Sequence, residues 1–200
     1  LKRAPSWSFH GEEYPSRKSL LTARDRVVEK HSDTTFILVH FANNPEDIEY
    51  VADLMEEHSN VYLDIAARVG EIGRHPSDRV REIFVKYSDR IMFGTDIMLR
   101  VASRGGKTRY RLTLGSISKG EPPELSDADD FYDDHWRYFE SDEKAIEHPV
   151  PIQGDWKVHP ISLPEETRRK FYVDNSERVV FAPWLARRTA HHVIDRANAQ

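Results

Sequence analysis

The sequence contains no cysteine. Disulfide bonds and thiolate metal ligands are therefore excluded, so any metal ion must be held by histidine and carboxylate side chains, which suit zinc, manganese or iron. Long hydrophobic runs are also missing, since none reaches the roughly 18 residues of a membrane span. No signal peptide is visible. We expect no membrane partner and a cytoplasmic location.

An excess of positive charge is missing too. The 200 residues include 29 basic and 34 acidic side chains, for a net charge of −5, and no block of Lys and Arg is present. This balance argues against a nucleic-acid partner. The standard motifs of dinucleotide-binding proteins, P-loop NTPases, α/β-hydrolases and zincins are absent. A small-molecule substrate remains the expected partner.

The first half of the chain alternates between helical and strand patterns. The predicted helices cover 16–31, 44–58 and 77–87, and the predicted strands cover 34–39, 60–66 and 90–96. Ser16, Asn44 and Ser77 are the expected N-caps. This alternation predicts an α/β fold with a parallel sheet and helical crossovers. The strands are apolar nearly throughout, as expected when both faces of a sheet are covered.

The second half has a different composition. Residues 97–160 contain "RGGK", "EPPELSDADD" and "HPVPIQGD" and are expected to be loop-rich, except that "DDFYDDHWRYFES" predicts a short helix or packed turn. Within it, His135 and Trp136 are expected either to close over a site or to belong to a packed surface helix. Helices are expected after Leu163 and again from Trp184 to Ala199.

Three polar residues lie where apolar strands end: His40, Asp64 and Asp96. In parallel α/β proteins the functional groups gather at the carboxyl ends of the strands. An imidazole and a carboxylate on neighbouring strand ends can share a divalent metal ion or a water bound to it. The alternatives are structural: a histidine that bonds a loop backbone, and an aspartate that caps a turn. For Asp64 the structural alternative is favoured, because "YLDIA" continues apolar after it.

Two arginines follow the second strand at the same expected edge. Arg68 or Arg74 would hold a substrate carboxylate through paired hydrogen bonds. The alternative is an ion pair with the nearby Glu71.

These patterns carry a resemblance to a known family. The segment with "FILVHFANNPED", "NVYLDIAARVGE" and "RIMFGTD" resembles the C-terminal half of the amidohydrolase-related family, which comprises metal-dependent (β/α)8-barrel hydrolases and decarboxylases. The closing "LPEETRRKFYVDNSERV" is similar to the terminal helix of that family, with Tyr172, Asn175 and Arg178 as its Tyr-x-x-Asn-x-x-Arg element. The similarity covers roughly residues 5 to 180.

The resemblance implies a metal site. His40 would be the sixth-strand histidine, acting as a metal ligand or a general acid/base, and Asp96 the eighth-strand aspartate, a metal ligand that also accepts a proton from the attacking water. We expect both to point into one pocket from adjacent barrel strands. The implied cofactor is zinc, with manganese or iron as alternatives. The implied reaction is hydrolysis of an amide, ester or lactone-like bond. Decarboxylation on the same scaffold and an inactive barrel fragment are the alternatives.

The resemblance also implies that part of a barrel lies elsewhere. The first-strand His-x-His pair and the fifth-strand histidine of the family are not in this sequence. We therefore expect residues 1–200 to form a single, incomplete barrel domain, with βα repeats in 1–96, an insertion in 97–160 and C-terminal helices in 161–200. Such a chain is expected to belong to a longer protein, with activity of its own in doubt, and it can form a homo-oligomer.

Overall fold

The computed structural model describes residues 13–115, 123–149 and 156–188. The first helix begins and ends where the sequence predicted. Helix α1 (Arg17–Lys30) begins after Ser16, whose hydroxyl accepts the Ser19 N–H at 3.1 Å. It ends at His31, whose N–H bonds the carbonyls of Val27 and Val28.

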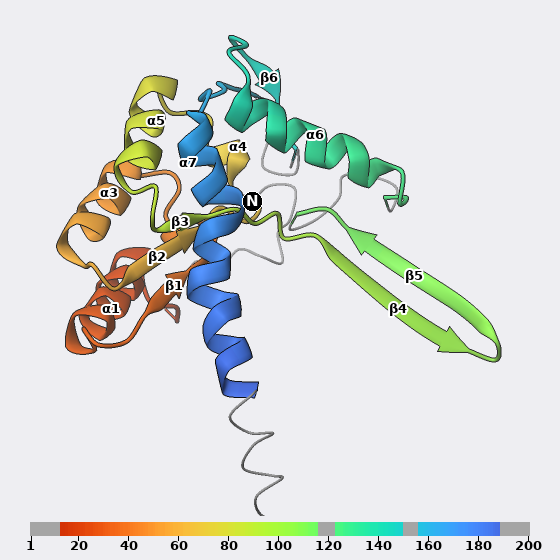
Figure 1. Cartoon of the computed structure of the whole chain (residues 1–200), viewed down its shortest axis with the longest axis horizontal. Coiled ribbons are helices and arrows are strands. Elements are labelled where there is room, and N and C mark those ends of the chain that lie inside the picture. The colour runs from red at the N-terminus through yellow and green to blue at the C-terminus, as the bar shows by residue number, and fades with distance from the viewer. Residues whose placement is uncertain (1–12, 116–122, 150–155, 189–200) are drawn as a thin grey trace, which may run out of the picture.

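A parallel sheet follows, as the sequence predicted. Its strands β1 (Phe36–Leu38), β2 (Val61–Asp64) and β3 (Ile91–Met92) lie in the order β1-β2-β3. The segments between them form α2 (Val39–Ala42), α3 (Ile48–Glu57), α4 (Val69–Ile72) and α5 (Ser77–Lys86). Figure 1 shows α1, α3 and α5 gathered on one side of the sheet. The described residues therefore form a mixed α/β fold with a three-stranded parallel sheet.

Two helix starts differ from the prediction. Helix α3 begins three residues later than expected, because the carboxylate of Asp47 rather than the side chain of Asn44 accepts the first free amide, that of Tyr50, at 3.1 Å. Ser77 is already the first residue of α5, and Pro76 precedes it. The apolar stripe of α3 is confirmed, because all five of its expected members are buried: Ile48, Val51, Ala52, Leu54 and Met55.

Residues 97–160 are more regular than their composition suggested. Strands β4 (Met98–Arg104) and β5 (Lys107–Thr113) form an antiparallel hairpin. Its two-residue turn, Gly105–Gly106, has φ values of 60° and 72°, which glycine adopts without strain and which match the twist of a hairpin. The glycines that indicated a loop are thus the turn of a hairpin. Strands β6 (Ile146–Glu147) and β7 (Lys157–Val158) form a second, short antiparallel pair.

The predicted aromatic segment is a full helix, α6 (Asp127–Glu140). The C-terminal helix is also confirmed, as α7 (Glu165–Arg169) followed by two π-helical stretches, η3 (Lys170–Asp174) and η4 (Glu177–Phe181), and helical backbone to residue 188. The part of the predicted terminal helix beyond residue 188 lies outside the described residues.

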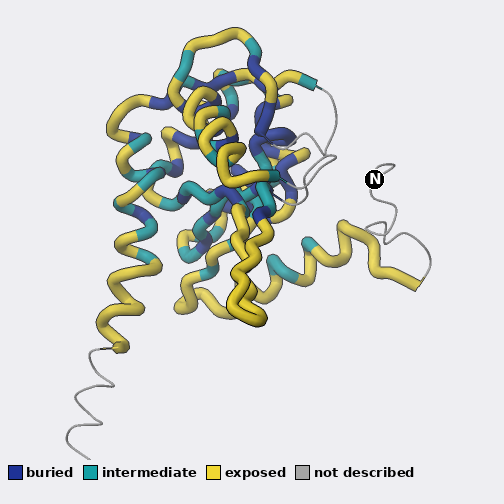
Figure 2. The backbone as a smooth tube through the Cα atoms, turned by 90° about the vertical axis from the view of Figure 1, so that its right-hand side faces the viewer, coloured by how far each residue is buried: buried dark blue, intermediate teal, exposed yellow. Residues whose placement is uncertain are grey.

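Aromatic rings connect these helices to the sheet. Phe171 of η3 lies 4.7 Å from Phe139 of α6, 5.6 Å from Phe84 of α5 and 5.6 Å from Phe93, the residue after β3, measured between ring centroids. Figure 2 shows the buried backbone in the body of the molecule, whereas the β4–β5 hairpin and the end of the C-terminal helix are exposed. In the part of the chain that the structure describes, no helix combines the length and the apolar character needed to cross a membrane.

Candidate functional site

His40 lies just after β1, and two contacts hold it, one to the last residue of β2 and one to the loop that follows. Its backbone N–H donates to Oδ1 of Asp64 at 2.8 Å, and its ring Nδ1 lies 2.7 Å from the carbonyl oxygen of Ala66. Because a carbonyl oxygen only accepts, Nδ1 must carry the proton, and Nε2 keeps its lone pair in the neutral ring. A histidine that ligates a metal through Nε2 is oriented in this same way by a backbone carbonyl.

Asp64 ties the ends of β1 and β2 together. Its Oδ1 accepts the N–H of His40 and also, at 3.0 Å, the N–H of Ala66. One carboxylate oxygen therefore positions both the backbone of His40 and the loop whose carbonyl holds the imidazole. This arrangement fits the structural alternative for Asp64, in which it supports the site residue rather than binding a ligand.

The backbone from His40 to Asn43 forms a left-handed turn. The φ values of His40, Phe41, Ala42 and Asn43 are 58°, 54°, 53° and 50°, a conformation that costs L-residues roughly 1–2 kcal/mol each. These four consecutive residues form the longest run of positive-φ, non-glycine residues in the described part of the chain. Such strain persists only where the surroundings determine the backbone, and it often accompanies functional sites.

Two arginines of α1 hold this turn from outside. Arg24 donates through Nη1 to the carbonyl oxygen of Ala42. Arg17 donates through Nη2 to the carbonyl oxygen of Asn43 at 3.1 Å and to the side-chain oxygen of Asn44 at 2.8 Å. These bonds satisfy carbonyls that a left-handed turn leaves without helix partners, and they compensate part of its cost.

Asp96 follows β3 at the same edge of the sheet, half-buried and with a φ of 59°. The expectation that His40 and Asp96 come from adjacent strands is wrong, because β2 lies between β1 and β3. The physical reason is the order of the crossovers: each βα unit adds the next strand beside the previous one, so chain order becomes sheet order. The last residue of this intervening strand is Asp64.

Two side chains at this edge of the sheet are of the types that bind a divalent metal. In its neutral tautomer His40 offers Nε2, and Asp96 offers a carboxylate, which are the donor types that zinc accepts. Among the described residues no group of three or more His, Asp or Glu side chains lies close enough together to hold a metal ion. Two donors are therefore available at the sheet edge, and the described part of the chain does not complete a ligand set.

Arg68 makes the ion pair that was the alternative to substrate binding. Its Nη1 lies 3.4 Å from Oε1 of Glu71, and both side chains are largely buried. Arg68 Nε and Glu71 Oε2 are buried without a hydrogen-bond partner. Burial raises the pKa of the Glu71 carboxyl, and the neighbouring Arg68 opposes that rise. The pair is thus incompletely satisfied, which is uncommon for buried charges.

Arg74 is exposed and lies against an aromatic ring. Its guanidinium carbon is 4.7 Å from the centroid of the Trp156 ring, a cation–π arrangement. The indole N–H of Trp156 donates to the carbonyl oxygen of Gly70 at 2.8 Å, which fixes the ring beside α4. Arg74 therefore has a different partner from Arg68, which pairs with Glu71.

Asn175 has a structural role at β3 that the sequence did not reveal. The resemblance named Asn175 only as a member of the Tyr-x-x-Asn-x-x-Arg element and gave it no role. Its amide donates to the carbonyl oxygens of Ser88 and Ile91 at 2.7 and 2.8 Å, and its side chain is buried. Arg178 adds bonds to the Asp89 carbonyl and to Oδ1 of Asn175. The C-terminal helix thus holds the start of the strand that leads to Asp96.

His135 was expected either at a site or in a packed helix, and the structure places it fully inside. Its Nδ1 donates to the carbonyl oxygen of Phe131 at 2.7 Å, and its Nε2 is buried without a partner. The ring meets Phe93 edge to face at 5.9 Å. Burial lowers the pKa of His135 to about 4, so the ring is neutral at pH 7. The packed-helix alternative is confirmed.

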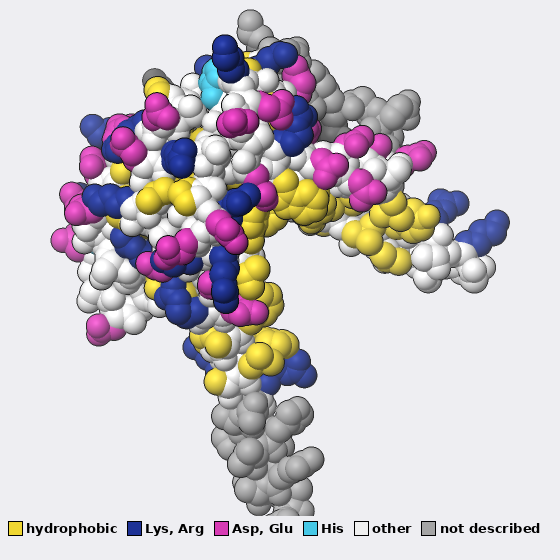
Figure 3. Space-filling model, turned by 45° about the horizontal axis from the view of Figure 1, so that its top comes forward, with side chains coloured by type: hydrophobic (Ala, Val, Ile, Leu, Met, Phe, Trp, Pro, Cys, Tyr) yellow, Lys and Arg dark blue, Asp and Glu magenta, His cyan; other side chains and the backbone are white. Residues whose placement is uncertain are grey.

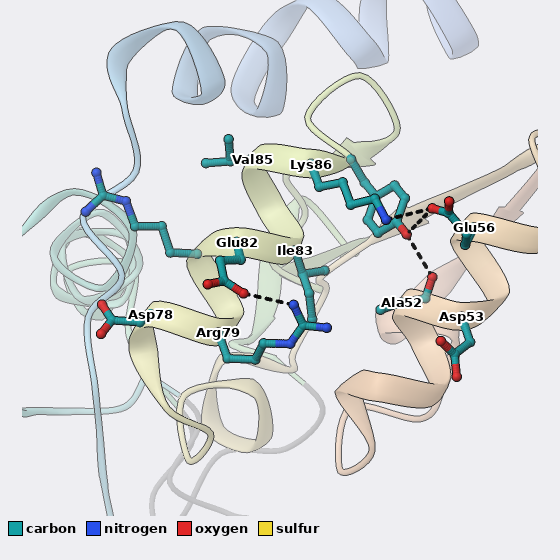
Figure 4. Close-up of a pocket in the computed structure, with 11 residues that line it drawn as sticks. Ala52, Asp53, Glu56, Asp78, Arg79, Glu82, Ile83, Val85 and Lys86 are labelled. Atoms are coloured by element: carbon teal, nitrogen blue, oxygen red, sulfur yellow. Dashed lines mark hydrogen bonds and ion pairs between the residues drawn. The ribbon is translucent and has the colours of Figure 1, made fainter.

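A groove of about 740 Å³ lies between α3 and α5, away from the strand ends. Figure 4 shows Arg79 and Glu82 directed toward each other, and Lys86 directed toward Glu56. Lys86 and Tyr87 both reach Glu56, at 2.8 Å each, and Arg79 pairs with Glu82 at 2.9 Å. Because these charges are mutually satisfied on an exposed helical surface, the groove is not the candidate active site.

Comparison with known proteins gives one match. A family model described as Amidohydrolase matches residues 5–182. No curated protein and no solved structure matches the chain. The matched range contains all three parallel strands, the left-handed turn and the C-terminal helix through η4.

Proposed function

The chain belongs to the amidohydrolase family, and from this premise we propose that it is the part of a metal-dependent hydrolase that carries the last strands of a (β/α)8 barrel. Residues 1–200 then form one incomplete barrel domain. The parallel order β1-β2-β3, with a helix after each of the first two strands, supports this placement. The proposed reaction is the attack of water on an amide, ester or lactone-like bond of a small substrate.

The single observation that carries the proposal is the tautomer of His40. The Ala66 carbonyl accepts a hydrogen bond from the Nδ1 proton, so in the neutral tautomer the lone pair lies on Nε2 at the carboxyl edge of the sheet, where barrel enzymes keep their active sites. His40 and Asp96 would contribute two ligands to a divalent ion, with zinc as the first candidate. When bound, the ion supplies Lewis acidity and lowers the pKa of water to about 7.

The chain's own residues then have distinct roles. His40 binds through Nε2 and is kept in place by Asp64, and Asp96 binds through its carboxylate and takes up a proton released by the attacking water. Arg68 and Arg74 supply positive charge in the loop after β2, which suits a substrate with a carboxylate. Arg74 is the more accessible of the two, because Arg68 already pairs with Glu71.

Metal stoichiometry tests the proposal without a known substrate. The intact protein is purified, loaded with Zn²⁺ and analysed by mass spectrometry for bound metal, alongside Asp96→Asn and His40→Gln. We expect about one ion per chain in the parent, and at least tenfold weaker binding in each variant. Asp53→Asn, at an exposed position on α3, is the matched control and is expected to bind as the parent does. Equal metal content in all four proteins would refute the assignment.

Product analysis then separates the two reactions that this family supports. The metal-loaded protein is incubated with amide, ester and lactone substrates and with aromatic carboxylates, and both the hydrolysis products and CO₂ are measured. Release of CO₂ without hydrolysis would replace the hydrolase with a decarboxylase on the same residues. Metal binding without either product would favour the inactive fragment.

A further inference from the structure

The β4–β5 hairpin, residues 98–113, has two chemically different faces. It is called the arm below. Cross-strand pairs place Leu99 beside Leu112 and Val101 beside Tyr110, so these side chains share one face. Leu112 is buried at the base of the arm, whereas Leu99, Val101 and Tyr110 are 53%, 61% and 62% exposed. The arm projects from the body of the molecule (Figure 1), and the exposed fractions of Leu99, Val101 and Tyr110 show that the described residues cover these side chains only in part.

The opposite face of the arm is cationic. The remaining pairs place Arg100 beside Arg111, Ala102 beside Arg109 and Arg104 beside Lys107. Five basic residues and no acidic residue therefore occur in 98–113. Like charges directly opposite each other destabilise an antiparallel pair, and an isolated two-stranded hairpin is marginal in water. The arm as it stands needs both a cover for its apolar face and nearby negative charge.

The charge of the rest of the chain decides which partner suits the arm. Removing the five basic residues of the arm from the 29 in the chain leaves 24 against 34 acidic residues, a net charge of −10. A body of that charge is repelled by nucleic acid and by anionic lipid. It is itself a suitable counter-charge, because helix α6 exposes four aspartates: Asp127, Asp129, Asp130 and Asp133.

A second exposed apolar surface lies on the C-terminal helix. The C-terminal helix exposes Val180, Phe181 and Trp184, at 40%, 54% and 51%. Figure 3 shows hydrophobic side chains on both the arm and this helix where they border the open angle between them, and acidic side chains of α6 above the arm. Exposed apolar surface that is contiguous and rimmed by charge marks an interaction site.

We propose that the arm is a dimerisation element: two copies of this chain pair through the apolar faces of their arms, and the aspartates of α6 supply negative charge near the arm's cationic side. An apolar face that meets its own copy is self-complementary, as a two-fold interface requires. Face-to-face packing keeps the two cationic faces apart, on the outer sides of the pair. The C-terminal helices border the same angle and add apolar surface to the contact.

Two lysine substitutions at neighbouring positions test the proposal. Val101→Lys and Ala102→Lys add the same side chain to the same exposed strand, but on the apolar and the cationic face respectively. The mass of each 200-residue protein is measured by light scattering during size-exclusion chromatography from 1 to 100 µM. We expect the parent and Ala102→Lys to give twice the 23.3 kDa of one chain. Val101→Lys should need a concentration at least tenfold higher than the parent does before it dimerises.

Tyr110→Thr is a second test of the apolar face. Threonine suits a strand and adds no charge. It is expected to weaken the dimer in the same direction, and circular dichroism checks that each variant keeps the parent's fold. A parent that is monomeric throughout, or lysine variants that behave alike, would overturn the proposal. So would binding of the parent to a fluorescent 20-base-pair DNA duplex or to phosphatidylglycerol vesicles that is lost in Arg100→Ser, because the arm would then serve a polyanion.

Discussion

The backbone N–H of His40 donates to the carboxylate of Asp64, and the same oxygen accepts the N–H of Ala66. One side chain of β2 thus joins the end of β1 to the loop that orients the imidazole. Asp64 bonds the turn that follows β2 through the Ala66 N–H, and its side chain also bridges the ends of β1 and β2. The bridge explains how a strained backbone at His40 keeps one conformation.

Replacing Asp64 tests this bridge. Asp64→Ala removes the acceptor of two amides, and we expect the free energy of unfolding to fall by about 1–3 kcal/mol. Asp64→Asn keeps an acceptor oxygen and should lose less than half as much. Urea denaturation measures both, and zinc titration should show weaker binding in Asp64→Ala by roughly 10- to 100-fold, because the orientation of His40 is lost. Equal losses in the two variants would contradict the role of Oδ1.

The left-handed turn predicts how the stability of the protein changes when Asn43 is replaced. Asn43 is exposed, and its φ and ψ are 50° and 28°. Asn43→Val puts a β-branched side chain in this conformation and should destabilise the protein by about 1–2 kcal/mol. Asn43→Gly should be neutral or slightly stabilising, because glycine has no steric penalty there. Thermal denaturation of the pair decides the matter, and a valine variant as stable as the glycine variant would show that the turn is not left-handed.

Asn175 should be intolerant of substitution although it touches no substrate. Asn175→Leu has a similar size but leaves the carbonyls of Ser88 and Ile91 without their donor, in one partly buried and one buried hydrogen bond. We therefore expect the free energy of unfolding to fall by about 2–4 kcal/mol. The neighbouring Ser176→Ala removes one exposed bond and should cost no more than about 0.5 kcal/mol. Guanidinium unfolding curves compare them, and similar midpoints for the two variants would argue against the role of Asn175.

His135 predicts a specific acid sensitivity. Its pKa is lowered by burial from 6.5 to about 4, so the unfolded chain binds a proton between these values while the folded chain does not. Above pH 6.5 the ring is neutral in both states and does not change the free energy of unfolding. As the pH falls toward 4, protonation of His135 in the unfolded chain lowers the free energy of unfolding by up to about 3 kcal/mol. His135→Phe keeps a ring beside Phe93 and removes the titration, so its advantage over the parent should grow from pH 7 to pH 4.5.

The measurement is the free energy of unfolding of both proteins in urea at pH 7, 5.5 and 4.5. All other titrating groups are common to the two proteins, so their difference isolates this ring. His31→Gln, at the exposed end of α1, is the control and should follow the parent. A constant difference between parent and His135→Phe at all three pH values would show that the imidazole is accessible to protons in the folded state.

Local patterns were sufficient for the regular βα part of the chain. Apolar spacing and the Ser16 cap gave α1 and its ends, and the apolar run from Phe36 to Leu38 gave β1, because each of these depends on residues close in sequence. The arm was missed for a physical reason. Gly105–Gly106 is compatible with any loop, and the alternation of Leu99 and Val101 with arginines becomes a pattern only when the opposite strand is in register.

The sequence by itself determined the α/β alternation, the absence of thiolate ligands, and His40 and Asp96 as polar residues at strand ends. Only the tertiary structure decided that β2 separates those two residues, that Asp64 and Ala66 fix the His40 ring, and that Arg68 pairs with Glu71 while Arg74 lies on Trp156. Helix and strand patterns arise from neighbours along the chain. Strand order and side-chain partners depend on residues that folding brings together from positions far apart.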